Sequence, residues 1–481
     1  MNKKALTIIQ MNDFHGYMEE HWEHFYEGNE SKYIIAGGLA RIASYLKHIR
    51  EEKKNNVLFF DGGDTFHGTH QVVKTKGKIL IPLLNKLGLD AMTAHWDFAY
   101  GPEAFNEIIS ELNYPMLAIN SFYKDTDELA YRPYIIKEIN DLKIGIIGIA
   151  ATIIDKTMPK HFSEGLYFTM GNKELPKYIK ELKEEKKVDL VIVVSHLGFP
   201  QEIKLIQEVY GIDVLLSAHT HNRIYEAVKI NDTIIIQSGC HGSFLGHLDL
   251  VIENKKIIDY KHKLVVLDKE IDEDSEMKLL VNKSMEPYRN TLNTVLGKTD
   301  TDLSRYEVLE STMDNFLLQS MLEYSKADIA FSNGWRYGAP IPKGDITEND
   351  LWNIIPVNPP LSKVVLTGKE IWDMLEENIE RTFATDPYEQ MGGYLKRCMG
   401  ISMYFKFENP YGERIQELFV GKEIIRPDKK YTVVYVTTQG VPEKYGENRK
   451  TLDIRAIDVL KEYIQKHKII SAPLNGNIRG V

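Results

Sequence analysis

Metal-binding residue types follow five apolar runs in the first half of the chain. The segments are "TIIQMNDFHG", "VLFFDGGDTFHG", "DAMTAHW", "LVIVVSHLG" and "VLLSAHTH", which begin at residues 7, 57, 90, 190 and 214. They contain Asp13, His15, Asp61, Asp64, His95, His196, His219 and His221. One histidine after a strand is usually a packed or solvated side chain, but five such placements indicate a shared site. Imidazoles and carboxylates without thiolates suit Mn, Fe, Co, Ni and Zn.

The size of this set predicts a pair of metal ions. The residues are too many for one tetrahedral zinc, whereas two divalent ions about 3.5–4 Å apart would use them all. Asp64 is the natural bridge, because the glycines of "GGD" let the backbone turn tightly beneath the ions. Two such ions acidify a shared water and hold a tetrahedral oxyanion, which predicts hydrolysis of a phosphate ester. We expect Mn²⁺ or Zn²⁺, and Fe, Co and Ni also fit the donors.

The elements that position these residues read as an α/β domain. Short β-rich runs, among them "NVLFF", "YPMLAI", "KIGIIGI" and "DLVIVVS", alternate with Lys/Glu-rich amphipathic stretches such as "LARIASYLKHIREEKK". This alternation favours largely buried strands covered by helices. The loops after the strands of such folds converge at one edge of a sheet, which would bring the metal-binding types together.

The chain is too long for one ordinary core, since it has 481 residues. We predict a catalytic domain over residues 1–266, a charged linker helix over 267–298 and a second domain over 299–481. The second domain has helical stretches such as "GKEIWDMLEENIERTF" and strand-like runs such as "YTVVYVT".

Composition limits the partners. A net charge of −10 disfavours a nucleic-acid polymer, so we expect a small anionic substrate. Two cysteines exclude a disulfide framework. No apolar run has the length of a membrane span, and the start lacks a long apolar signal region, so we expect a cytoplasmic protein with no membrane partner. The oligomeric state is not encoded in these features.

The ordered set "NDFHG", "DGGD", "SHLG" and "AHTH" resembles the calcineurin-like metallophosphoesterases. With "ADIAFSNGWRYGAPIPKGDIT" and "NPPLSKVVLTGKEIWDML" in the second half, the chain is similar to the two-domain 5'-nucleotidase family. The resemblance implies a four-layer α/β/β/α metallophosphoesterase domain followed by a smaller α+β domain. It also implies in-line attack of metal-activated hydroxide on a phosphate ester, without a covalent enzyme intermediate.

The resemblance also implies a ligand set. One metal ion would be held by Asp13, His15 and His221. The other would be held by His95, His196 and His219, and both would share Asp64. His241, in "SGCHGSFLG", follows a strand as the ligands do, but the family does not usually have a metal ligand there.

The segment around His95 departs from the nucleotidase pattern. Nucleotidases usually have Asn-His-Glu-Phe-Asp here, and the His and Asp form a dyad that steadies the transferring group. This chain has Trp96 and Ala99 in those two places, so the dyad is missing. The His-Trp pair resembles the related sulfate thiohydrolases, as does "EQMGGYLKRCMGISM".

Several residues are candidates for binding the substrate. Arg336 and Arg397 align with family arginines. A guanidinium can donate two parallel hydrogen bonds to phosphate or sulfate oxygens. Together with Asp64 and His95, the two arginines would act at the reacting group. Asn333, Tyr394 and Trp96 would line the same site. The Gly-Gly-Asp-Gly-Tyr motif that accompanies a second aromatic platform for a nucleobase is absent.

The sequence therefore predicts a phosphoric ester hydrolase of 5'-nucleotidase type that acts on phosphate monoesters. One alternative is a thiohydrolase-like enzyme that releases sulfate or a related anion from a sulfur-bound or carrier-bound group. A second alternative is a binding protein that retains the metals without turnover.

Overall fold

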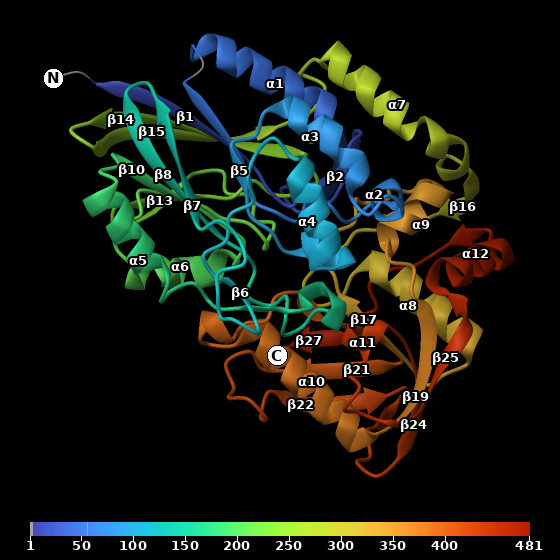
Figure 1. Cartoon of the computed structure of the whole chain (residues 1–481). Coiled ribbons are helices and arrows are strands. Elements are labelled where there is room, and N and C mark those ends of the chain that lie inside the picture. Colours follow the sequence, from blue (N-terminus) through green and yellow to red (C-terminus); the bar gives the residue numbers. More distant parts are fainter. Residues whose placement is uncertain (1–2, 55) are drawn as a thin grey trace. The chain divides into compact units, whose positions relative to one another are not determined.

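The computed structural model describes residues 3–54 and 56–481. They form two units. The first unit comprises Met1–Glu23 and Ile34–Glu286, and the second comprises His24–Tyr33 and Pro287–Val481. Each unit has its own sheets, which are visible in Figure 1.

Two mixed sheets form the centre of the first unit (Figure 1). The first has the order β15 (Lys256–Val266), β14 (Phe244–Glu253), β1 (Lys4–Met11), β4 (Val57–Asp61) and β5 (Ala91–Met92). The second has the order β12 (Val228–Ile230), β13 (Thr233–Ile236), β11 (Val214–Leu216), β10 (Leu190–Ser195), β8 (Leu142–Ile149) and β7 (Tyr134–Ile139). Strands β1, β4 and β5 run parallel to one another, as do β8, β10, β11 and β13.

Successive side chains of each strand point to opposite faces of its sheet, and this alternation produces the layers of the first unit. In β10, Ile192 and Val194 point into a core shared with Leu6 and Ile8 of β1, so the two sheets pack face to face. The intervening Val193 joins the other face, where it packs with residues of α5 (Leu175–Lys180) and α6 (Phe199–Glu208). Helices α1 (Leu39–Glu52) and α3 (Ile81–Leu87) lie on the far side of the first sheet (Figure 1). This arrangement is the predicted α/β/β/α sandwich.

The remaining elements of the first unit are short. They include α2 (His70–Lys74), α4 (Pro102–Glu111), the strand pair β6 (Ser121–Tyr123) and β9 (Leu166–Phe168), and the 3₁₀ turn η2 (Trp96–Tyr100). The apolar run at 114–119, which we predicted to be a strand, forms only isolated bridges at Met116 and Leu117. None of the helices in the described part of the chain is long and apolar enough to cross a membrane.

A hairpin of β2 (His21–Glu27) and β3 (Glu30–Ala36) begins in the first unit, but its tip belongs to the second. Within the second unit, the ring of His24 lies 5.1 Å from that of Tyr306. The second unit is therefore built from two separate stretches of the chain.

The second unit is an α+β fold. Its largest sheet has the order β20 (Tyr394–Met399), β17 (Ile329–Gly334), β24 (Lys430–Val436), β19 (Pro360–Thr367) and β25 (Glu447–Arg455). Smaller sheets contain β23 (Glu423–Ile424), β22 (Ile415–Val420), β21 (Ile401–Phe405) and β27 (Ile478–Gly480), and β18 (Gly344–Thr347), β16 (Val295–Thr299) and β26 (Ile469–Ile470). The helices are α8 (Thr312–Ser325), α9 (Glu348–Ile354), α10 (Gly368–Phe383), α11 (Thr437–Gly440) and α12 (Ala456–His467).

Helix α10 shows how local sequence sets the elements of this unit. Thr367 caps its start, because its hydroxyl accepts the backbone N–H of Glu370 while the Glu370 carboxylate accepts the N–H of Thr367. Ile371, Leu375 and further residues at helical spacing then pack into the core of the sheet.

The predicted linker, 267–298, contains α7 (Ser275–Leu292), and the division between the units falls inside this helix, at Glu286 and Pro287. The domain limits proposed from the sequence thus differ from the compact units at this point. Proline within the helix removes one backbone donor at the division.

Candidate metal centre

Seven side chains from five strand ends of the first unit lie together in two overlapping groups. One group is Asp64, His95, His196 and His219, and the other is Asp13, His15, Asp64 and His221. In each group the nitrogen and oxygen atoms that could bind a cation lie within 4.8 Å of one another. These are the residues predicted as ligands, divided as the family resemblance divides them.

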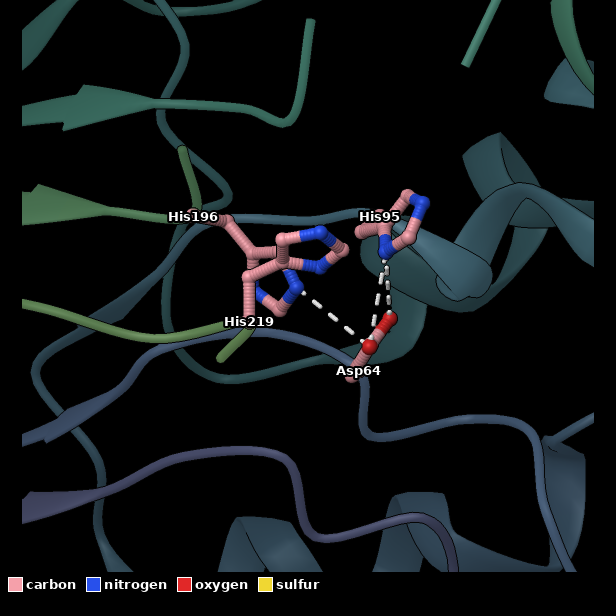
Figure 2. A group of neighbouring side chains, drawn as sticks. All are labelled: Asp64, His95, His196 and His219. Carbon is pink, nitrogen blue, oxygen red and sulfur yellow. Dashed lines mark hydrogen bonds and ion pairs between the residues drawn. The ribbon is translucent and has the colours of Figure 1, made fainter. Parts of the chain in front are cut away.

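Asp64 lies between the two groups. Its Oδ1 is 3.2 Å from Nδ1 of His95, and its Oδ2 is 3.3 Å from Nε2 of His196. The three imidazoles of the first group lie next to this carboxylate (Figure 2). Oδ2 is also 3.7 Å from Nε2 of His15, in the second group. One carboxylate thus reaches histidines of both groups, as a bridging ligand must.

Asp13 is the second carboxylate of the centre. Its Oδ1 is 3.2 Å from Nε2 of His221 and 3.7 Å from Nε2 of His196. The side chain of Asn12 donates to Oδ2 of Asp13 over 2.7 Å and so restricts its orientation. Six of the seven side chains belong to buried residues, and His221 is partly exposed.

The histidine tautomers fit a cation between these atoms. Nδ1 of His196 lies 2.6 Å from the carbonyl oxygen of Gly62, and Nδ1 of His15 lies 3.2 Å from that of His67. A carbonyl only accepts, so Nδ1 carries the proton and Nε2 of the neutral ring presents a lone pair. In His196 that lone pair faces the carboxylate of Asp64, an arrangement that either a cation or a second proton satisfies. Backbone carbonyls hold metal-binding histidines in this way in many proteins.

The charges of the centre are compatible with cation binding. Burial would raise the pKa of the Asp64 carboxyl, but His95 and His196 hold that pKa well below its usual value. Burial lowers the pKa of His15 to about 3, which keeps this imidazole neutral. Burial would also lower the pKa of His196, but the Asp64 carboxylate raises it to about 10. A cation at this position would therefore displace a proton.

The backbone at these residues adopts an uncommon conformation. Five of the seven residues have positive φ, between 49° and 73°: Asp13, His15, Asp64, His219 and His221. Side chains other than glycine rarely adopt this region, and such residues gather at functional sites. These residues form tight left-handed turns directly after the strands, and their side chains meet in the centre.

Asp97 organises the centre without belonging to either group. Its Oδ1 accepts the backbone N–H groups of Thr65 and Phe66, and its Oδ2 accepts those of Asp64 and His95. The four distances lie between 2.8 and 3.0 Å. Sequence reasoning assigned Asp97 no role. Its only signal in the sequence was an acidic residue two positions after His95, a predicted ligand.

The two positions of the missing dyad lie on one 3₁₀ turn. Trp96 and Ala99 are three residues apart in η2, where side chains at that spacing eclipse. The indole of Trp96 stacks on His67 at 4.8 Å and meets Phe162 edge-on at 5.4 Å. Its backbone N–H donates to Oδ1 of Asp64 over 2.7 Å. Trp96, predicted to line the substrate site, is thus largely buried by packing.

The other predicted substrate residues lie in the second unit. Arg336 donates to the carbonyl of Gly393 over 2.9 Å, and its guanidinium lies 5.3 Å from the ring centre of Tyr394. Asn333 lies in β17, near its end, and receives a 3.4 Å contact from the Thr437 hydroxyl. These three predicted residues therefore share one region of the unit.

The guanidinium of Arg397 also lies 5.3 Å from the ring centre of Tyr394, but it is buried. Nε is 3.0 Å from Asp314, and the two terminal nitrogens donate to the carbonyls of Val308 and Glu307. These donors are engaged inside the unit, so the geometry favours a supporting role for Arg397.

Comparisons with known proteins agree with this architecture. Residues 6–223 match the family model of the calcineurin-like phosphoesterases, and residues 291–439 match that of the 5'-nucleotidase C-terminal domain. The 5'-nucleotidase of Bos taurus is 25% identical over 98% of this chain and 90% of that protein. The trifunctional nucleotide phosphoesterase protein YfkN of Bacillus subtilis is 26% identical over 89% of this chain, which corresponds to 31% of its own length.

Solved structures share the fold over nearly the whole chain. The sulfate thiohydrolase SoxB of Thermus thermophilus superimposes with a TM-score of 0.92 at 21% identity, over 99% of this chain and 96% of that one. A 5'-nucleotidase precursor from Thermus thermophilus gives 0.86 at 23% identity, over 99% of both chains. With a calcineurin-like phosphoesterase domain followed by a 5'-nucleotidase C-terminal domain, the chain belongs to the 5'-nucleotidase family of metallophosphoesterases, which are phosphoric ester hydrolases.

Proposed function

We propose that the protein hydrolyses phosphate monoesters, nucleotides among them, with two divalent cations held by the seven residues of the centre. The observation that carries this proposal is the position of Asp64, whose carboxylate reaches histidines of both groups. The relatives named 5'-nucleotidase support nucleotides as the substrate class. Imidazole and carboxylate donors without thiolate favour Mn²⁺ or Zn²⁺.

When bound, two such cations acidify a water molecule and neutralise charge on a phosphoryl group. The protein's own contribution is placement. Asp64 is oriented by the N–H of Trp96, and Asp13 by the amide of Asn12. Buried surroundings strengthen each electrostatic contact and limit competing water. In the second unit, we assign Asn333, Arg336 and Tyr394 to the substrate, and Arg397 to the support of Tyr394.

Hydrolysis of p-nitrophenyl phosphate and adenosine monophosphate by purified protein tests this proposal. The chelator-treated protein should be inactive, and Mn²⁺ or Zn²⁺ should restore phosphate release. If the protein retains its metal but no phosphate ester in a broad panel is hydrolysed, the alternative of a metal-retaining binding protein is favoured instead.

Removal of the metal ions should also destabilise the fold. We expect chelation to lower the free energy of unfolding by about 3 kcal/mol, as for a ligand present at roughly 100 times its Kd. The lone pair on Nε2 of His15 would then face the Asp64 carboxylate, and the left-handed turns would lose their support. Urea unfolding with and without chelator measures the change. Asp64→Asn is the matched control and should respond to the chelator much less; an equal response would contradict binding at this centre.

Restoring the dyad should raise nucleotidase activity. The double substitution Trp96→His and Ala99→Asp places an imidazole and a carboxylate on the same side of η2. We expect kcat on adenosine monophosphate to rise about tenfold, a modest share of what general acid catalysis contributes. Ala99→Asp alone is the control and should give no gain. An unchanged kcat in a double variant that is folded and metal-loaded would show that the missing dyad does not limit the reaction.

Trp96 also supports a second candidate function. The His-Trp pair resembles the sulfate thiohydrolases, and the fold superimposes on SoxB. Sulfate release from a peptide carrying a sulfonate on a cysteine-bound sulfur, measured by ion chromatography, tests it. A higher kcat/KM on this peptide than on any phosphate ester would favour the thiohydrolase.

A further inference from the structure

A third group of possible metal ligands lies in the first unit, outside the two groups described above. It consists of His21 and Glu23, which are two residues apart on β2, and His241, which follows β13. Their ligand atoms lie within 4.8 Å of one another. Glu23 and His241 are buried, and His21 is partly exposed. Residues two apart on a strand point to the same face, which is why His21 and Glu23 converge.

The carboxylate of Glu23 is the centre of this group. Its Oε2 lies 3.6 Å from Nδ1 of His241 and 4.0 Å from Nε2 of His21. Its Oε1 accepts a hydrogen bond from Arg223 over 2.8 Å. The arginine therefore fixes the carboxylate so that the other oxygen faces both imidazoles.

His21 is held in the tautomer that a metal requires. Its Nδ1 lies 3.1 Å from the carbonyl of Glu19, so Nδ1 donates and Nε2 of the neutral ring presents its lone pair. The Ser243 hydroxyl lies 3.0 Å from the same Nε2 and donates to its lone pair, so a cation would displace this hydrogen bond. This carbonyl contact corresponds to those of His15 and His196 in the main centre.

His241 connects this group to the main centre. Its ring centre is 6.1 Å from that of His15 and 6.2 Å from that of His221. Its backbone N–H donates to the carbonyl of Asp13 over 2.8 Å, and its φ of 60° matches the left-handed turns of the main ligands. The third group and the main centre are therefore adjacent, but they share no residue.

We propose that His21, Glu23 and His241 form a third divalent-cation site beside the metal pair. Two imidazoles and one carboxylate are a donor set that zinc accepts with a fourth position left for another ligand. Because Arg223 shares the carboxylate and adds a positive charge nearby, this site binds its cation more weakly than the main centre does. The third cation is therefore the first to leave when free metal is lowered.

Metal counting tests this inference. The full-length protein is dialysed to equilibrium against buffered Zn²⁺, and bound zinc is measured by elemental analysis at rising free concentrations. We expect a binding curve that reaches two equivalents per chain and then three. His21→Phe and Glu23→Gln should stop at two. His262→Phe, which removes a histidine of β15 outside the group, is the matched control and should reach three.

His21→Phe is the decisive variant, because an aromatic ring preserves the 4.6 Å packing against Tyr17. Circular dichroism confirms that each variant is folded before its metal is counted. A plateau at two equivalents in the unchanged protein would overturn the inference, and so would a third equivalent that persists in His21→Phe.

The outcome is separable from that of the proposed function. Asp64→Asn should lose binding at the main centre but keep the equivalent that His21→Phe removes. An inactive protein with three equivalents would contradict the proposed hydrolysis and leave the third site standing. An active protein that binds only two equivalents of zinc would support the proposed hydrolysis and contradict the third site.

Discussion

Replacing Asp64 with Asn is expected to lower kcat/KM for phosphate-ester hydrolysis about 10³-fold, which corresponds to several kcal/mol of lost metal stabilisation of the transition state. The amide keeps the size of the side chain but offers one neutral oxygen in place of two anionic ones. His95, His196 and His15 would then no longer face a shared carboxylate. Initial rates with p-nitrophenyl phosphate at saturating Mn²⁺ measure the loss.

Asp213→Asn is the matched control for this experiment. Asp213 precedes β11 and accepts the backbone N–H of Val191, but it belongs to neither metal group. Its variant should stay within a factor of about three of the parent rate, since surface and peripheral substitutions usually change little. A folded Asp64→Asn protein with the parent's rate would remove Asp64 from the mechanism.

Asp97→Asn should have the largest effect on stability. We expect it to lower the free energy of unfolding by about 4 kcal/mol, because hydrogen bonds to a charged acceptor contribute roughly 1.5–3 kcal/mol each and two of the four are lost. The new amide NH₂ would point its protons at two backbone N–H donors that Asp97 now satisfies. Urea unfolding of the metal-free proteins measures the difference.

Asp90→Asn is the comparison for Asp97. Asp90 accepts one backbone N–H, from Phe59, over 2.9 Å, and forms a 2.8 Å ion pair with Lys137. It should lose only about 1 kcal/mol. Similar losses in the two variants would show that the four contacts of Asp97 contribute no more than the single hydrogen bond and ion pair of Asp90.

Much of the first unit could be predicted from the sequence because several of its strands, among them β4, β10, β11 and β13, are buried on both faces. Such strands are continuous apolar runs, and "LVIVVS" became β10 with Ile192 on one face and Val193 on the other. The run at 114–119 looked the same but makes only isolated bridges. An apolar run indicates that a segment is buried. Whether the segment pairs as a β-strand depends on the strands beside it, which its own sequence does not specify.

The metal centre shows the same limit. Histidines and carboxylates after recognisable strands indicated the region, and the resemblance to the metallophosphoesterases selected the seven residues; Asp61, of the same type and placement, lies in neither group. Asp97 could not be predicted, since its partners are backbone N–H groups, which carry no residue-type signal. The surroundings of Arg397 were equally hidden, because Asp314 lies far away in the sequence. His21 and Glu23 lie on β2, whose exposed and buried positions give no apolar run to mark it.

The β2–β3 hairpin affects how the protein can be divided for separate expression. The second unit includes His24–Tyr33 as well as everything from Pro287 onward. A gene fragment starting at codon 287 would encode this unit without the hairpin tip and without the ring of His24 beside Tyr306. A fragment ending at codon 286 would keep that tip, detached from its packing partners. Tags, reporters and truncations are better placed at the chain ends than at the apparent domain border.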